Sequence, residues 1–150
     1  MTSNPSNASS SPLRAEIIAP FVQAAVETLS TMAGIKVQRK SVTLKKGYQM
    51  HGEISGVIGL SGKTAGTCAV SLPLKAAVHV IESLICETLP PDLDQQVLRD
   101  GVGELINMIA GRAKAILSTT PYKFDITLPT IISGANHEVF HRKGTHCVMV

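Results

Sequence analysis

Glu104 and Asn107 are the two side chains of this sequence whose types and spacing suggest chemistry. They are three residues apart, so on a helix both can reach one point outside the backbone. A carboxylate pairs with cations, and a carboxamide can both donate a hydrogen bond to a water molecule and accept one from it. The neighbouring residues supply no general base and no metal cluster. Taken alone, the pair favours an ordinary solvated helix face. Together with the absence of a nearby base or metal cluster, its shared position on one face predicts a surface that acts on a docked partner.

The element that must carry this pair is a long helix, which runs to about Ser118 and ends before Pro121. Apolar residues form one stripe along it, and polar residues form the opposite stripe at positions 100, 104, 107, 111, 114 and 118. Asn and Gly are weak helix formers, so the polar stripe gives up helix stability, and a docking site explains why. We expect Gly103 and Gly111 to leave room for a partner's backbone, and the candidate partner-binding residues are Asp100, Gly103, Gly111 and Lys114.

The rest of the chain predicts the sheet on which this helix lies. Pro20 suits the first position of a helix that Gly34 ends, and Pro73 opens a second helix. Alternating patterns predict strands over residues 36–44, 53–60, 65–72, 124–128, 130–133 and 146–150, with a polar connection over 134–144. Pro129 indicates a sheet edge or a bulge between two of these strands. Because regular βαβ alternation is absent, the order predicts an α+β fold, an antiparallel sheet with helices packed on it.

The bulk composition limits the function. The 150 residues fit one domain over residues 17–150, after a Ser- and Asn-rich leader over residues 1–16. A net charge of +3, five aromatic residues and no long basic run argue against nucleic-acid binding. No apolar run is long enough for a membrane span, and three cysteines without paired spacing fit a reducing cytoplasm.

Two motifs suggest other functions. Residues 59–64 resemble a phosphate-binding loop, but Val57 stands where that motif needs glycine, and a strand rather than a helix is predicted to follow. A hairpin turn is therefore the preferred interpretation. His137 and His141 have the spacing of zinc ligands on a helix, but they lie among Gly and strand-forming residues. We interpret them as exposed loop histidines, and we expect no metal site and no cofactor of the chain's own.

The long helix also resembles a known motif. In the CheC/CheX/FliY family of chemotaxis phosphatases, Asp or Ser, then Glu, then Asn are followed by a distant proline; Asp100, Glu104, Asn107 and Pro129 match this pattern. Residues 20–34 resemble the opening helix of that family, and residues 54–62 resemble its glycine-rich hairpin. The single Glu-x-x-Asn copy and residues 104–117 are similar to the CheX subfamily, and the resemblance covers residues 17–150.

The resemblance implies a CheC-like fold and a cytoplasmic phosphatase. Its substrate would be the aspartyl phosphate of a phosphorylated CheY-like response regulator, which would hold the Mg²⁺ itself. Asn107 would position the attacking water, and Glu104 would dock on the regulator's lysine. The resemblance also suggests a homodimer. A non-catalytic adaptor that binds a response regulator or serves a flagellar switch is the alternative.

The end of the chain departs from the pattern of this family. CheX-like chains continue into a final strand, whereas this sequence stops at Val150 inside a predicted strand. A truncated chain, a second subunit that covers the apolar edge, and a fold weakened by the missing strand are the three interpretations that the sequence leaves open.

Overall fold

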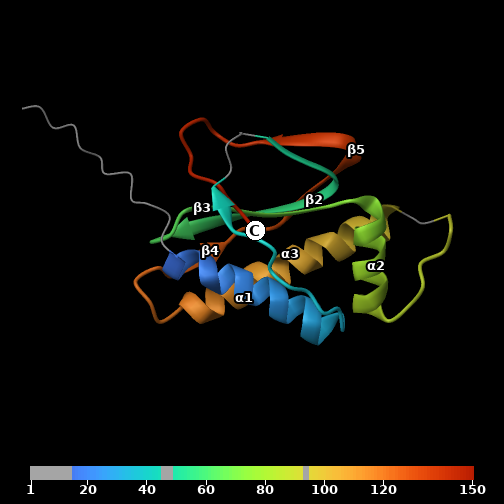
Figure 1. Ribbon diagram of the computed structural model, residues 1–150, viewed down its shortest axis with the longest axis horizontal. Helices are drawn as coiled ribbons and strands as arrows, with labels where there is room; N and C mark the ends of the chain where they lie inside the picture. Colours follow the sequence, from blue (N-terminus) through green and yellow to red (C-terminus); the bar gives the residue numbers. More distant parts are fainter. Residues whose placement is uncertain (1–14, 45–48, 93–94) are drawn as a thin grey trace, which may run out of the picture.

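Three helices cover one face of an antiparallel sheet in the computed structural model, which describes residues 15–44, 49–92 and 95–150 (Figure 1). The helices are α1 (Ala15–Met32), α2 (Leu74–Ile85) and α3 (Gln95–Leu117). In Figure 1, α1 and α3 lie side by side beneath the sheet, and α2 stands at one end of them. The predicted α+β fold is confirmed, and α3 ends one residue before the predicted Ser118.

Strand β2 (Gln49–Gly62) is the centre of the main sheet. One of its edges pairs with β3 (Gly66–Leu72), and the other pairs with β5 (Thr130–Phe140) and then with β4 (Phe124–Ile126), all antiparallel. A separate two-stranded sheet joins β1 (Thr43–Leu44) to β6 (Val148–Met149). The β2–β3 hairpin confirms the preferred interpretation of residues 59–64, since a strand and not a helix follows the turn.

The core lies between β2 and the buried side of α3. Ile54, Gly56 and Ile58 alternate along β2 and are buried. A side chain at Gly56 would begin only 3.0 Å from Ile106 of α3, so this glycine lets the helix approach the strand closely. The apolar stripe of α3 is buried as predicted, and the large residues of the core include Ile54, Ile58, Ile81, Val102, Leu105, Ile106 and Ile109. This packing determines which side of α3 faces outward.

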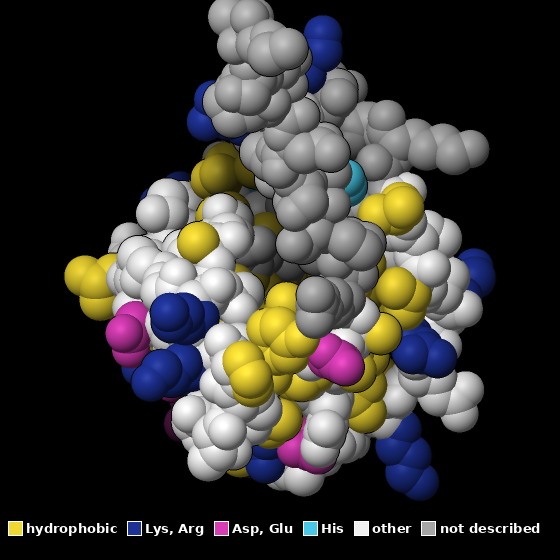
Figure 2. Space-filling model, turned by 90° about the vertical axis from the view of Figure 1, so that its left-hand side faces the viewer, with side chains coloured by type: hydrophobic (Ala, Val, Ile, Leu, Met, Phe, Trp, Pro, Cys, Tyr) yellow, Lys and Arg dark blue, Asp and Glu magenta, His cyan; other side chains and the backbone are white. Residues whose placement is uncertain are grey.

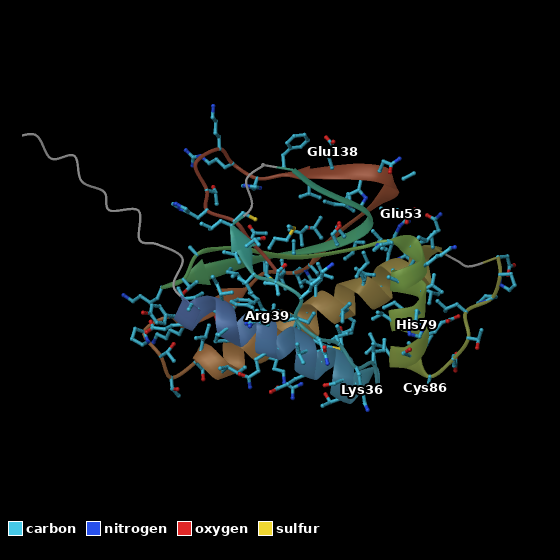
Figure 3. The ribbon with its side chains drawn as sticks, in the orientation of Figure 1. Lys36, Arg39, Glu53, His79, Cys86 and Glu138 are labelled. Atoms are coloured by element: carbon cyan, nitrogen blue, oxygen red, sulfur yellow. The ribbon has the colours of Figure 1, made fainter. Side chains whose placement is uncertain are left out.

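Two side-chain contacts attach the smaller helices. Arg112 of α3 forms a 2.8 Å ion pair with Glu27 of α1. The carboxylate of Glu53, at the end of α2 nearest the sheet in Figure 3, accepts a 2.7 Å hydrogen bond from the backbone N–H of Leu74. This is one of the first N–H groups of α2, which have no partner within the helix itself. The first contact attaches α1 to α3, and the second attaches α2 to β2. Neither α1 nor α2 contributes to the polar stripe.

The first helix differs from its prediction. It begins by Ala15 rather than at Pro20, which lies inside the helix. Glu16, in the additional turn, accepts a 2.7 Å hydrogen bond from the hydroxyl of Tyr122, which holds this turn against the segment after α3. The end was correct, because Gly34 has the positive φ of 65° expected of a helix-terminating glycine. Nearly all of the predicted leader over residues 1–16 lies outside the described residues.

Two strand predictions were also wrong. The strand predicted over residues 36–44 is confined to Thr43–Leu44, which pair with Val148 and Met149 of β6. The polar connection predicted over residues 134–144 is strand up to Phe140. There β5 passes a register shift opposite Gly52 and Ile54, where Gly134 and Asn136 have positive φ, and then resumes pairing with β2. The polar and glycine residues of this segment therefore led to the prediction of a loop where the chain forms a strand.

Candidate functional site

Glu104 and Asn107 lie on the outward side of α3, where both residues are exposed. Val102, Leu105 and Ile109 on the opposite side are at most 3% exposed. Neither polar side chain forms a hydrogen bond or an ion pair with any residue that the structure describes. The helix is thus fixed by its buried stripe, while one carboxylate and one carboxamide remain available to another molecule.

The pair borders a shallow hollow of about 340 Å³ between α3 and the adjoining edge of the sheet. From α3 it is lined by Arg99, Asp100, Gly103, Glu104 and Asn107, and from the sheet side by Pro129 and Ile131. The four motif residues named in the sequence analysis, Asp100, Glu104, Asn107 and Pro129, therefore meet at one place.

A β-bulge brings Pro129 to this place. Leu60 pairs with Ile126 and Val57 pairs with Thr130, so residues 58 and 59 of β2 lie opposite residues 127–129. The one extra residue interrupts the ladder between β4 and β5. Thr127 holds the two sides together, since its N–H donates to the Gly59 carbonyl at 3.0 Å and its hydroxyl accepts from the Gly59 N–H at 2.9 Å. The sequence suggested a sheet edge or a bulge at Pro129, and this pairing is a bulge.

The two glycines of the stripe have different environments. Gly103 is buried, and a Cβ there would lie 3.5 Å from Ile131 and 3.9 Å from Pro129. Contrary to the expectation of open space, the sheet edge lies against this position at ordinary van der Waals distance. At Gly111 no atom lies within 4 Å of the position of a Cβ, so open space is present there as predicted.

Arg99 is a charged residue of the hollow that the sequence pattern did not single out. Its Nε donates to the Ser133 hydroxyl of β5 at 3.1 Å, and its Nη2 donates to the Gln95 side chain at 3.0 Å. The spacing of Gln95 and Arg99, four residues on one helix, was a visible signal. The contact with Ser133 depends on the register of β5 and has no signal in the sequence. Beside it, Asp100 accepts a 2.7 Å hydrogen bond from Gln96.

Lys114, the last candidate residue on the stripe, lies outside this hollow. Its ammonium group is 2.8 Å from a carboxylate oxygen of Asp125 on β4. The hydrogen bond from Lys114 and its positive charge hold the pKa of Asp125 below the usual value, against a small opposing effect of desolvation and with help from Lys123. These residues belong to a second hollow toward the end of the helix.

The histidines considered in the sequence analysis do not form a metal centre. His137 lies on β5 and not in a loop, and it is half-buried. Its Nδ1 is 3.1 Å from the Gly134 carbonyl, and its Nε2 is 2.8 Å from the hydroxyl of the buried Ser55. Throughout the described residues, no group of three or more His, Cys, Asp or Glu could hold a metal ion. Within the same residues, no helix has the length and apolar character needed to cross a membrane.

Comparison with known proteins identifies similar chains. The family described as chemotaxis phosphatase CheX matches residues 54–150. The CheY-P phosphatase CheX of Thermotoga maritima is 26% identical over 125 residues, which are 83% of this chain and 80% of that protein.

Two solved structures extend the comparison. A CheC-like superfamily protein from Shewanella sp. PV-4 is 31% identical, with a TM-score of 0.81 and coverage of 91% of this chain and 88% of that one. A chain of the CheX–CheY–BeF3–Mg²⁺ complex of Borrelia burgdorferi is 27% identical, with a TM-score of 0.68 and coverage of 80% and 78%.

Proposed function

Because the chain belongs to the CheX family of chemotaxis phosphatases, we propose that it hydrolyses the aspartyl phosphate of a CheY-like response regulator. The observation that carries this proposal is the exposed, unpaired Glu104 and Asn107 at the rim of the hollow. Relatives support the partner class, since one is named as a CheY-P phosphatase and another forms a complex with CheY.

Asn107 would orient the attacking water. Phosphoryl transfer needs little covalent help from a protein and depends mainly on positioning and electrostatics. In the hydrolysis a water oxygen forms a bond to phosphorus, the bond to the aspartyl oxygen breaks, and the regulator recovers its carboxylate. A carboxamide suits the alignment of this water because it has both a donor and an acceptor. Mg²⁺ would be supplied by the regulator and not by this chain.

Glu104 would dock the regulator. It lies one helical turn before Asn107 on the same face, so a cation that pairs with it would place the phosphoryl group near the carboxamide. We propose the regulator's active-site lysine as that cation. Because Glu104 is exposed before binding, the pair would contribute modestly to affinity, and its main effect would be on orientation.

The test compares phosphate release with and without Asn107. CheY-type regulators from the source organism are phosphorylated with acetyl phosphate, and the loss of phosphate is timed with the wild-type chain, Asn107→Ala and Gln23→Ala. Gln23 is the matched control, a carboxamide exposed on α1. We expect Asn107→Ala to lose roughly 10²–10³ in rate, as when one preorganised polar group is removed, while Gln23→Ala keeps the wild-type rate.

Two outcomes contradict parts of the proposal. Wild-type turnover by Asn107→Ala would exclude the water-positioning role. Stoichiometric binding of a phosphorylated regulator with no acceleration by the wild-type chain would indicate an adaptor instead of a phosphatase. Glu104→Ala separates docking from chemistry: it should raise KM and leave kcat nearly unchanged, and a reduced kcat at unchanged affinity would assign Glu104 to the chemical step.

A further inference from the structure

A basic hollow lies at the other end of the polar stripe. We define it by Lys63 in the β2–β3 turn, Lys114 on α3, and Lys123 and Asp125 at the start of β4. Figure 2 views the molecule from this end and shows Lys and Arg side chains gathered beside an acidic one. The side chains of Lys114 and Asp125 are 42% and 79% exposed, so the group is accessible from solvent.

The charges in the basic hollow are unbalanced. Three lysines and one carboxylate line the hollow, and that carboxylate is already paired with Lys114 at 2.8 Å. Among the residues that the structure describes, Lys63 and Lys123 have no ion-pair partner. Lys123 also acts on Asp125 through its charge, so the three lysines leave a net excess of two positive charges for an external anionic group.

The basic hollow continues the candidate site. Lys114 follows Asn107 by seven residues, almost two full turns, so both lie on the same face of α3. It follows Glu104 by ten residues, which at the rise of an α-helix is a distance of about 15 Å. The first hollow carries the carboxylates of Asp100 and Glu104 against one cation, Arg99, whereas the basic hollow carries three lysines against one carboxylate, Asp125. The outward face of the helix is thus negative at one end and positive at the other.

We infer that the basic hollow is a second docking site for the response regulator and binds a cluster of carboxylates on its surface. The inference rests on the proposed function. The partner's carboxylates would lie beside the turn of α3 that carries Lys114, which is about 15 Å along the helix from Glu104. Because the face carries opposite charges at its two ends, only one orientation of the regulator along α3 satisfies both ends, and this orientation delivers the phosphoryl group to Asn107. Exposed charges act over about a Debye length of 8–10 Å, so their effect falls on association and weakens with salt.

The experiment removes the two available charges and keeps the Lys114–Asp125 pair. Lys63→Ala/Lys123→Ala is compared with Lys36→Ala/Lys75→Ala, which has the same change in net charge. Lys36 and Lys75 are exposed and line neither hollow, and Lys36 lies just beyond the C-terminal end of α1 (Figure 3). Phosphate release gives kcat and KM from low salt to about 0.3 M salt. Titration with the same regulator loaded with BeF3 and Mg²⁺ gives the affinity without turnover.

We expect Lys63→Ala/Lys123→Ala to raise KM and Kd roughly 3- to 10-fold at low salt with unchanged kcat, and to reduce the salt dependence. The control variant should match the wild-type chain. Equal KM, Kd and salt dependence for both double variants would overturn the inference while the proposed function stands. A wild-type chain that binds the regulator without hydrolysis would refute only the phosphatase. A change confined to self-association in light scattering would assign the basic hollow to contacts between copies of the chain and overturn the inference.

Discussion

Gly111→Ala is a substitution that we expect to make the fold more stable. Gly111 lies inside α3, and the space that a Cβ would occupy has no atom within 4 Å. Alanine is favoured over glycine in a helix interior by about 0.8–1.0 kcal/mol, and here no steric cost opposes this gain. The midpoint of thermal unfolding should therefore rise by about 3 °C for a domain of this size. The chain thus has a glycine that its own packing does not require.

The assay combines stability with docking. Urea unfolding of the wild-type chain and Gly111→Ala measures the stability, and Gly101→Ala is the opposite control on the same helix. A Cβ at Gly101 would lie 2.8 Å from Ile81, and we expect this overpacking to cost about 1–3 kcal/mol before the helix gain is subtracted. Gly111→Leu should stay folded but raise KM for the phosphorylated regulator at least about 10-fold, because its bulk lies on the docking face.

The results that refute this reasoning are specific. A lower stability for Gly111→Ala would mean that the folded chain itself needs glycine at this position. An unchanged KM for Gly111→Leu would mean that the partner does not approach this turn of α3. Both results together would exclude the hypothesis that position 111 is glycine because a partner docks there.

Two further substitutions and one thiol reagent test the contacts and the burial that hold the fold together. Glu53→Ala removes the acceptor at the N-terminus of α2 and should lower the free energy of unfolding by about 1 kcal/mol in urea titration. Arg112→Ala should cost less than about 1 kcal/mol, because its ion pair with Glu27 is exposed on both sides. Burial raises the pKa of the Cys68 thiol to about 11, so a disulfide reagent at pH 8 should modify the exposed Cys86 well before Cys68. Since that pKa is higher than in the unfolded chain, its contribution to stability should be lost as pH rises from about 9 toward 11.

The sequence predicted most of the elements that hold the site, because their signals are local. The apolar period of α3 predicted which side is buried, and Gly34 and Pro73 marked the end of one helix and the start of another. Pro129 predicted an interruption of the sheet, either an edge or a bulge, and the motif grouped it with three residues of α3. The sequence did not predict that Arg99 and Ile131 would lie beside them.

The errors have a common physical origin in pairing between distant segments. The second half of β5 contains Gly134 and Asn136, which are poor strand formers, and it is strand because β2 supplies its partner. Arg99 is placed by Ser133, and Gly103 is buried by Ile131, both from that same strand. A sequence pattern over a few residues does not predict the register in which β5 pairs with β2.

The interrupted edge of the sheet also bears on how long a complex can last. In the described part of the chain, β4 and β5 pair only with β2, so their outer side is a free sheet edge. Pro129 has no N–H, and the bulge around it disturbs the row of backbone groups that could recruit a further strand from another protein. Beside Pro129 a partner therefore finds few regular backbone groups to pair with, which favours contact with side chains there. Such a contact can dissociate quickly, and rapid release of the product would let one molecule serve many regulators in succession.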